Sequence, residues 1–278
     1  MRDIVFCRYI EKQGVILTDT ASRFDLSGKT AIVTGGTRGI GEMIATGFVK
    51  AGVKVYITSR KADACKAMED KLSAFGTCIA HPSDLSTNEG IEAYAAWIGE
   101  REQSLDILVN NAGAAWGQPI EEFTEAGWDR VMDLNVKSLF FLTQKLLPQL
   151  RAASAATGRG RIINIGSVEG FTMPMAPGNF AYPASKAAVH HLTRSLAKEF
   201  APDQITVNAI SPGPFESKMT AYALGTDEGK KMVSAGIPLG RIGSADDMIG
   251  LSTFLASAAS DYITGVSIPL DGGYVNLR

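Results

Sequence analysis

A serine, a tyrosine and a lysine are spaced along the second half of the chain in a way that suits proton transfer. Ser167 follows the apolar run 162–165, and Tyr182 and Lys186 come fifteen and nineteen residues after it. Residues four apart are neighbours on one helix face, so the Lys186 ammonium is expected beside the Tyr182 phenol. Pro183 is favoured in a first helical turn, which places Tyr182 where the helix dipole favours an anion. Both effects predict that the pKa of Tyr182 falls from about 10 towards neutrality, making it a usable proton donor.

A glycine-rich turn follows the first apolar run of the chain and leads directly into a helical pattern. Glycine lets the backbone turn sharply and approach an anion, and free N–H groups at a helix N-terminus stabilise phosphate. The order of strand, turn and helix predicts a pyrophosphate site, although the spacing differs from the common G-x-G-x-x-G template and an ordinary tight turn is the alternative. The residues of this predicted site are Gly35, Thr37, Arg38, Gly39, Ile40 and Gly41.

The end of the second apolar run bears on which dinucleotide binds. A carboxylate at this point would hold the ribose 2′-hydroxyl of NAD, but the chain has Ser59, Arg60 and Lys61 here. Arg60 and Arg38 could bracket a 2′-phosphate, because a guanidinium matches phosphate oxygens in a two-pronged geometry. NADP is therefore the predicted cofactor, with solvated charges at a helix start as the alternative.

The amino-acid composition indicates which class of protein carries these residues. The chain has 278 residues, of which 45% are apolar and 20% charged, as in an ordinary globular protein. A formal charge of −2 without a basic run argues against nucleic acid as a partner. Three scattered cysteines indicate a reducing cytoplasm rather than a disulfide framework. The longest uncharged run, 170–185, is interrupted by prolines and is shorter than the roughly 18 apolar residues that span a bilayer, so no membrane span is predicted.

Short β-branched runs alternate with longer helical patterns from residue 26 onward, which is typical of a parallel sheet with helices on both faces. Strands are predicted at 31–34, 53–57, 78–79, 107–109, 162–165, 205–210 and 266–268. Helices are predicted at 40–51, 62–75, 88–101, 125–153, 184–200, 228–235 and 245–258. The expected fold class is α/β, a single doubly wound, Rossmann-type domain over residues 25–278 with about seven parallel strands flanked by helices. Residues 1–24 are interpreted as an N-terminal accessory arm.

These motifs and several others resemble the short-chain dehydrogenase/reductase family over residues 26–278. The glycine turn is similar to the family's cofactor turn, Asp84-Leu85 to its adenine-contacting acid, and Pro212-Gly213 to the turn near the nicotinamide. Each motif alone could occur by chance, but their joint chance occurrence is negligible. Besides the glycine turn, the resemblance implies cofactor contacts from Ser59, Arg60, Asp84, Leu85, Asn111, Ala112, Gly113, Tyr182, Lys186, Pro212, Gly213 and Phe215.

The resemblance also implies a catalytic tetrad of Asn135, Ser167, Tyr182 and Lys186. Ser167 would donate a hydrogen bond to a substrate carbonyl oxygen, and Tyr182 would protonate that oxygen as hydride arrives from the nicotinamide. Lys186 would tune Tyr182 and hold the nicotinamide ribose, while Asn135 would position a water that resupplies protons. The expected activity is NADPH-dependent reduction of a carbonyl.

Within the family, the chain is similar to 3-oxoacyl-thioester (β-ketoacyl) reductases, including the type associated with rhamnolipid synthesis. The gap between Ser167 and Tyr182 is about two residues longer than in the fatty-acid synthesis enzymes, which changes one wall of the substrate site. Flexible methionines and other apolar residues in the walls suit an acyl chain, while loop-anchoring core contacts or a subunit interface would explain them equally well. These residues are Phe171, Met173, Met175, Phe180, Phe215, Met219, Tyr222 and Leu224. The alternatives are a polyol, sugar-acid or steroid dehydrogenase on the same scaffold and, more remotely, a nonenzymatic dinucleotide sensor.

The predicted partners are a small-molecule carbonyl substrate and further copies of the chain. The long apolar helix at 125–153 resembles the family's dimerisation helix, so a homodimer or homotetramer is expected. His190 and His191 are adjacent, and adjacent helical residues point in different directions. No metal site is predicted.

Overall fold

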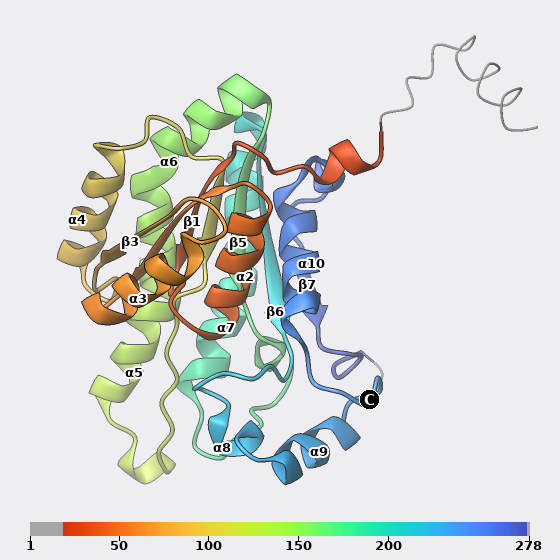
Figure 1. Cartoon of the computed structure of the whole chain (residues 1–278). Coiled ribbons are helices and arrows are strands. Elements are labelled where there is room, and N and C mark those ends of the chain that lie inside the picture. Colours follow the sequence, from red (N-terminus) through yellow and green to blue (C-terminus); the bar gives the residue numbers. More distant parts are fainter. Residues whose placement is uncertain (1–18, 277–278) are drawn as a thin grey trace, which may run out of the picture.

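Seven parallel strands form one sheet in the order β3-β2-β1-β4-β5-β6-β7 (Figure 1). The computed structural model describes residues 19–276. The strands are β1 (Thr30–Thr34), β2 (Lys54–Ser59), β3 (Cys78–Pro82), β4 (Ile107–Asn110), β5 (Gly160–Ile165), β6 (Ile205–Pro212) and β7 (Ser267–Leu270). The predicted doubly wound sheet is therefore confirmed. The chain starts in the middle of the sheet, reaches one edge at β3 and returns to β4, which creates a switch point between β1 and β4 where such sheets bind ligands.

Helices cover both faces of the sheet (Figure 1). One face carries α2 (Gly39–Lys50), α3 (Ala62–Leu72) and α10 (Ala245–Ala256), and the other carries α4 (Asn88–Gly99), α6 (Ser138–Thr157) and α7 (Ala181–Phe200). The helices predicted at 40–51, 62–75, 88–101, 184–200 and 245–258 are confirmed, with ends that differ by a few residues.

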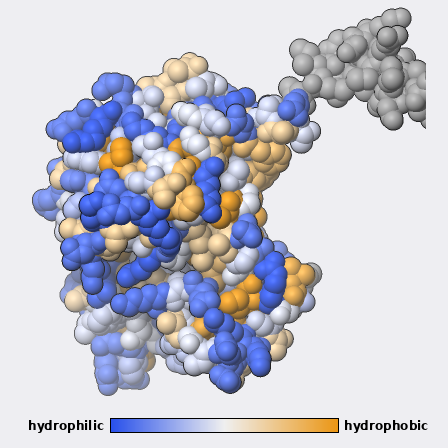
Figure 2. Space-filling view, in the orientation of Figure 1, coloured by the Kyte–Doolittle hydropathy of each residue, from blue (hydrophilic) through white to orange (hydrophobic). Residues whose placement is uncertain are grey.

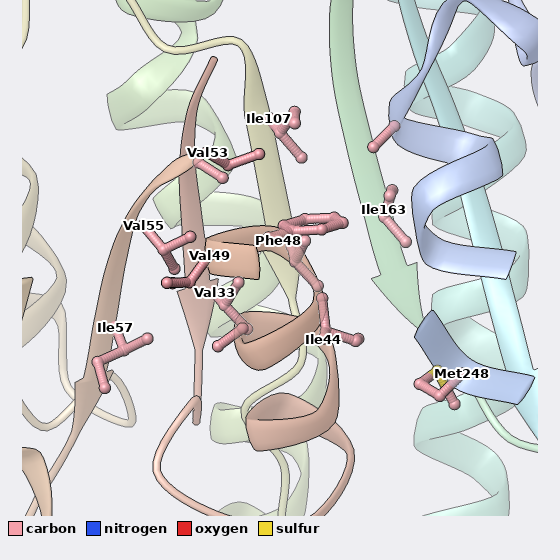
Figure 3. Close-up of a cluster of buried hydrophobic side chains, with 14 of the residues drawn as sticks. Val33, Ile44, Phe48, Val49, Val53, Val55, Ile57, Ile107, Ile163 and Met248 are labelled. Atoms are coloured by element: carbon pink, nitrogen blue, oxygen red, sulfur yellow. The ribbon is translucent and has the colours of Figure 1, made fainter. Parts of the chain in front are cut away.

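Successive residues of the central strands belong to two separate cores. Ile32 packs with α4, α6 and α7, whereas Val33 packs with α2, α3 and α10. Figure 3 shows the second of these cores, in which Phe48 and Ile44 from α2 lie against β-branched side chains of the sheet. Because both faces of a parallel sheet are buried, its strands need apolar residues at nearly every position, which explains their continuous apolar runs.

The predicted helix at 125–153 is interrupted, and this part of the prediction is wrong. The structure has α5 (Glu125–Met132), one π-helical segment (Asp133–Lys137) and then α6. A π segment inserts an extra residue into a helix and is frequent at functional sites, and hydrophobic periodicity does not detect it. The segment contains Asn135, which is 2% exposed. Trp128, Phe140 and Phe141 are exposed on α5 and α6, and their pairing with a second copy stays a prediction.

The end of the predicted accessory arm packs against the domain. A short 3₁₀ helix spans Ala21–Phe24, and the Arg23 guanidinium lies 3.0 Å from the Asp261 carboxylate. The Phe24 ring lies 6.4 Å from the Phe254 ring, centroid to centroid. Residues 1–18 of the arm lie outside the described residues.

Two short helices follow β6 on the side of the sheet where the strands end (Figure 1). They are α8 (Ala221–Leu224), which was not predicted, and α9 (Asp227–Ala235), which was predicted at 228–235. None of the described helices is long and apolar enough to cross a membrane. Within residues 19–276, no group of three or more His, Cys, Asp or Glu side chains could hold a metal ion.

Candidate active site

The glycine turn between β1 and α2 has the backbone geometry that a bound phosphate requires. Gly35 and Gly39 have φ angles of 65° and 56°, in the left-handed region that favours glycine. A Cβ atom at Gly41 would lie 2.4 Å from both the Asn111 amide nitrogen and the Gly35 carbonyl oxygen, so only glycine fits there. Among the described residues, no side chain caps the start of α2 at Arg38. These uncapped N–H groups fit a pyrophosphate.

Four hydrogen bonds join the end of β4 to the start of the glycine turn, one of them from the Asn111 amide to the Gly35 carbonyl oxygen at 3.2 Å. The Asn111 amide donates to the Thr34 carbonyl oxygen at 2.7 Å. The backbone N–H groups of Asn111 and Ala112 both donate to the Thr34 hydroxyl at 2.9 Å. Gly113 follows, and a Cβ atom there would lie 3.8 Å from Lys186 Nζ. The β4 end thus lies between the predicted phosphate site and the predicted catalytic lysine.

The predicted adenosine-side residues lie at the ends of β2 and β3. Ser59 ends β2, and Arg60 follows it with an exposed side chain, as Arg38 also has. Partial burial acts to raise the pKa of Asp84, but hydrogen bonds from Ser86 and the charge of Arg60 hold it below its usual value. The Arg60 charge therefore lies close to Asp84. Leu85 is 2% exposed in the core, which leaves its backbone to contact a cofactor.

Asn135 joins two parts of the predicted site through its side-chain amide. Its oxygen accepts from the Ala114 N–H at 2.8 Å, and its nitrogen donates to the Ala114 carbonyl at 3.0 Å. The same nitrogen donates to the Ser185 hydroxyl at 2.9 Å. Asn135 therefore holds the segment after β4 next to α7. Ser185 did not stand out in the sequence, because a serine inside a helical pattern carries no signal of its partner.

Ser167, Tyr182 and Lys186 come together where β5 ends and α7 begins. Ser167 caps a 3₁₀ turn (Val168–Gly170), and its hydroxyl accepts from the Glu169 N–H at 3.2 Å. Tyr182 is the second residue of α7, as predicted. Lys186 Nζ lies 5.6 Å from the centroid of the Tyr182 ring and donates to the Ile165 carbonyl at 2.7 Å.

The predicted acidity of Tyr182 is wrong for this structure. Burial raises the pKa of Tyr182 to about 12, and the neighbouring Ser167 hydroxyl only partly opposes this effect. Burial also lowers the pKa of Lys186 to about 8. The reason is that the ammonium is directed to the Ile165 carbonyl, while both groups have lost solvation. Spacing along a helix predicted their proximity but not this cost of burial.

The segment after β6 lies against the glycine turn. The Gly213 N–H donates to the Leu270 carbonyl at 3.0 Å, which fixes the turn after Pro212. A Cβ atom at Gly39 would lie 3.3 Å from Ser217 Cβ. Ser217 is thus a neighbour of the phosphate site that sequence reasoning missed, because nothing local in the loop indicates which turn it reaches.

Two further buried groups were not predicted as site residues. His190, one helical turn beyond Lys186, has a ring nitrogen 2.8 Å from the Ser211 hydroxyl, and burial lowers its pKa to about 4. Glu169 is 6% exposed and accepts hydrogen bonds from the Met175 N–H and the Asn179 amide. The sequence around Glu169 does not show that its side chain is buried.

Most of the apolar residues predicted to form the substrate wall lie at the surface. Six predicted wall residues are exposed, namely Phe171, Met173, Met175, Phe180, Met219 and Tyr222. Phe215 and Leu224 are buried instead, and Leu224 lines a cavity beside the glycine turn. Any cofactor contact of Phe215 would therefore involve its backbone. Figure 2 shows hydrophobic residues at the surface just above α9.

A cavity of about 510 Å³ opens beside the glycine turn, between α2, α8 and α10. Its described lining includes Gly39, Met43 and Ser217 but not Ser167, Tyr182 or Lys186.

Comparisons with known proteins agree with this arrangement. A family model described as enoyl-(acyl carrier protein) reductase matches residues 35–275. The chain is 47% identical over 251 residues to the rhamnolipids biosynthesis 3-oxoacyl-[acyl-carrier-protein] reductase of Pseudomonas aeruginosa, covering 90% of this chain and 98% of the relative. It is 38% identical to the 2-dehydro-3-deoxy-D-gluconate 5-dehydrogenase of Bacillus subtilis, covering 91% and 97%.

Solved structures show the same similarity. The NADP active-site complex of Pseudomonas aeruginosa RhlG matches with a TM-score of 0.87 and 46% identity, covering 91% of this chain and 99% of that one. A gluconate 5-dehydrogenase from Burkholderia cenocepacia, in complex with NADP and tartrate, matches with a TM-score of 0.83 and 30% identity, covering 92% and 98%.

Proposed function

The chain belongs to the short-chain dehydrogenase/reductase family of oxidoreductases, and on that premise we propose that it reduces a carbonyl group with NADPH, with Tyr182 as the proton donor. The observation that carries this proposal is that two sites lie side by side at the carboxyl ends of the neighbouring strands β1, β4 and β5. The glycine turn accommodates a dinucleotide phosphate, and Ser167, Tyr182 and Lys186 lie next to the β4 end that is bonded to this turn.

Bound NADPH would supply the hydride that reduces the carbonyl carbon. Ser167 and Tyr182 would hold the carbonyl oxygen, and the Tyr182 hydroxyl would give it a proton as negative charge develops. A phenol with a raised pKa remains protonated at neutral pH and can still act as an acid in this reaction. The alkoxide formed by hydride addition is a much stronger base than a phenolate, so proton transfer from Tyr182 to it is favourable. Lys186 and Asn135 would hold the neighbouring parts of the site in place.

Arg60 is proposed to select NADPH over NADH through the 2′-phosphate. We expect Arg60→Asp to weaken NADPH binding by about tenfold to a hundredfold, because a charge-assisted hydrogen bond contributes about 1.5–3 kcal/mol. Fluorescence titration with NADPH and NADH would measure both affinities. The exposed Lys61 supplies a control, since Lys61→Asp changes the same charge one residue away. If wild-type chain bound both dinucleotides equally well, the assignment would fail.

We propose 3-oxoacyl thioesters as the substrate class. The exposed methionines and aromatics near Tyr182 suit an acyl chain, and a relative with 47% identity is named for such a reductase. NADPH oxidation should therefore be faster with acetoacetyl-CoA and longer 3-oxoacyl-CoA thioesters than with simple ketones. Spectrophotometry at equal substrate concentrations measures this order. Activity confined to polyols with NAD would overturn it.

Sugar acids are the second candidate substrate class. Relatives named as gluconate and 2-dehydro-3-deoxy-D-gluconate dehydrogenases cover nearly the whole chain. Exposed Glu216 and Lys218 also place charge near the apolar wall. Including gluconate and 2-dehydro-3-deoxy-D-gluconate with both dinucleotides in the same assay separates the two classes.

A further inference from the structure

A buried carboxylate connects the two ends of the loop between Ser167 and Tyr182. Glu169 lies two residues after Ser167, and its oxygens accept from the Met175 N–H at 3.2 Å and the Asn179 amide at 3.1 Å. Asn179 lies three residues before Tyr182 and is 9% exposed. One side chain therefore bridges the turn that carries Ser167 and the residues that lead into α7.

Burying a carboxylate costs free energy unless hydrogen bonds or opposite charges replace its lost hydration. Isolated ionised groups are strongly disfavoured away from water, and residues 19–276 supply two hydrogen-bond donors for the two oxygens of Glu169. Asn179 Oδ1 is itself buried without a partner among the described residues. A neutral or apolar side chain would avoid this desolvation cost, so the stability of the loop alone does not account for an acid at this position.

We propose that Glu169 is a positioning residue whose carboxylate holds Ser167 and Tyr182 at the separation needed to bind one carbonyl oxygen. This inference rests on the proposed carbonyl reduction. Within the loop that it closes, residues 170–180, Phe171 and Thr172 donate to the Val168 carbonyl and Gly178 accepts from the Gln118 N–H. Glu169 adds a side-chain tie from the Ser167 end of this loop to Met175 and Asn179. Misplacement of reacting groups by about 1 Å can cost about a hundredfold in rate.

The charge of Glu169 supports the same role. Burial is the main cause of the raised pKa values of Tyr182 in α7 and Tyr222 in α8, and the charge of Glu169 adds to both. Burial also raises the pKa of Glu169 itself, an effect that the hydrogen bonds it accepts oppose. Of the other titratable groups on α7, Lys186 carries the opposite charge and His190 is neutral, because burial lowers its pKa to about 4. Glu169 therefore favours the acid form of Tyr182, which reduction consumes.

Kinetics of two Glu169 variants test the proposal, with acetoacetyl-CoA and NADPH as the probe. We expect Glu169→Ala to lower kcat about tenfold to a hundredfold without changing the NADPH affinity. Asn179→Ala should lower kcat by a smaller factor. Glu169→Gln keeps the shape but removes the charge, so the limb of 3-hydroxybutyryl-CoA oxidation that rises with pH, where Tyr182 must lose its proton, should move to lower pH. Glu199→Gln alters an exposed carboxylate of α7 and should leave kcat and the pH profile unchanged.

Two results would overturn the proposal. In the first, Glu169→Ala and Asn179→Ala keep a kcat within twofold of wild type while Tyr182→Phe is inactive. This result would leave the proposed function intact. The other is a Glu169→Ala variant in which kcat, the affinity for NADPH and the melting temperature all fall together, while the pH profile of Glu169→Gln stays that of wild type. If Tyr182→Phe retained full activity, the proposed function itself would fail.

Crystal structures decide the inference even if acetoacetyl-CoA is not reduced. We expect the Ser167 and Tyr182 hydroxyls to be adjacent in the wild-type chain and in Glu199→Gln but separated in Glu169→Ala. An unchanged separation of the two hydroxyls in Glu169→Ala would contradict the positioning role. If Glu169→Ala does not fold, the same conclusion would follow from Glu169→Gln, provided that its bonds to Met175 and Asn179 are broken and the separation is unchanged.

Discussion

Replacing Tyr182 by phenylalanine is expected to lower kcat for carbonyl reduction by about 10²–10⁴-fold, the range that general acid catalysis contributes. The change removes one hydroxyl and keeps the ring, so the packing at the start of α7 should be preserved. The affinity for NADPH should therefore stay within about twofold of wild type. Stopped-flow measurement of NADPH oxidation, together with a separate binding titration, distinguishes loss of the proton donor from loss of cofactor.

Tyr222 provides the matched control for this variant. It is 69% exposed near the same site, and its pKa is raised by burial and by Glu169, as that of Tyr182 is. Tyr222→Phe removes the same atom from a phenol that has no proposed part in proton transfer, so kcat should change by less than about threefold. Equal losses in the two variants would show that Tyr182 acts through local packing rather than as the acid.

Replacing Lys186 by methionine should lower kcat by about 10²–10³-fold, as loss of a preorganised donor typically does. The same change should not lower stability at pH 7. A buried ammonium whose pKa is lowered from 10.5 to about 8 costs the folded state about 3 kcal/mol while it is protonated. Methionine removes this cost, although the Ile165 carbonyl then loses its donor, which opposes the gain by about 1–3 kcal/mol.

The effect of pH on the Lys186 variant has a definite sign. Below pH 8 the amine is protonated in both the folded and the unfolded wild-type chain, and the full cost of burial is present. Between pH 8 and 10.5 the unfolded state binds more protons than the folded state, so wild-type stability rises with pH. The stability of Lys186→Met relative to wild type should therefore fall by about 3 kcal/mol from pH 7 to 10.5.

Urea denaturation at several pH values measures this difference. Lys198→Met, an exposed lysine of the same helix, should show no comparable trend because its ammonium is solvated in both states. A relative stability of Lys186→Met that stayed constant with pH would show that the Lys186 ammonium is not destabilised by burial.

Local sequence was sufficient to predict the layout of the protein and the types of residue in its site. The continuous apolar runs identified all seven strands, because a parallel sheet buries both faces of each strand. The glycines of the turn were recognisable because they meet local demands on φ, as at Gly35 and Gly39. Tyr182 was placed at a helix start from Pro183 alone, since the preference of proline for the first turn is also local.

Only the tertiary structure decided how these residues are held and how acidic they are. The bridge from Asn135 to Ala114 and Ser185 needs a π segment, which leaves no mark in the pattern of apolar residues. The burial of Glu169 and the raised pKa of Tyr182 depend on chain segments that are distant in sequence and remove water from these groups. Helical spacing determines which side chains are neighbours, whereas solvation, which sets the free energy of their charged forms, is a property of the whole packed molecule.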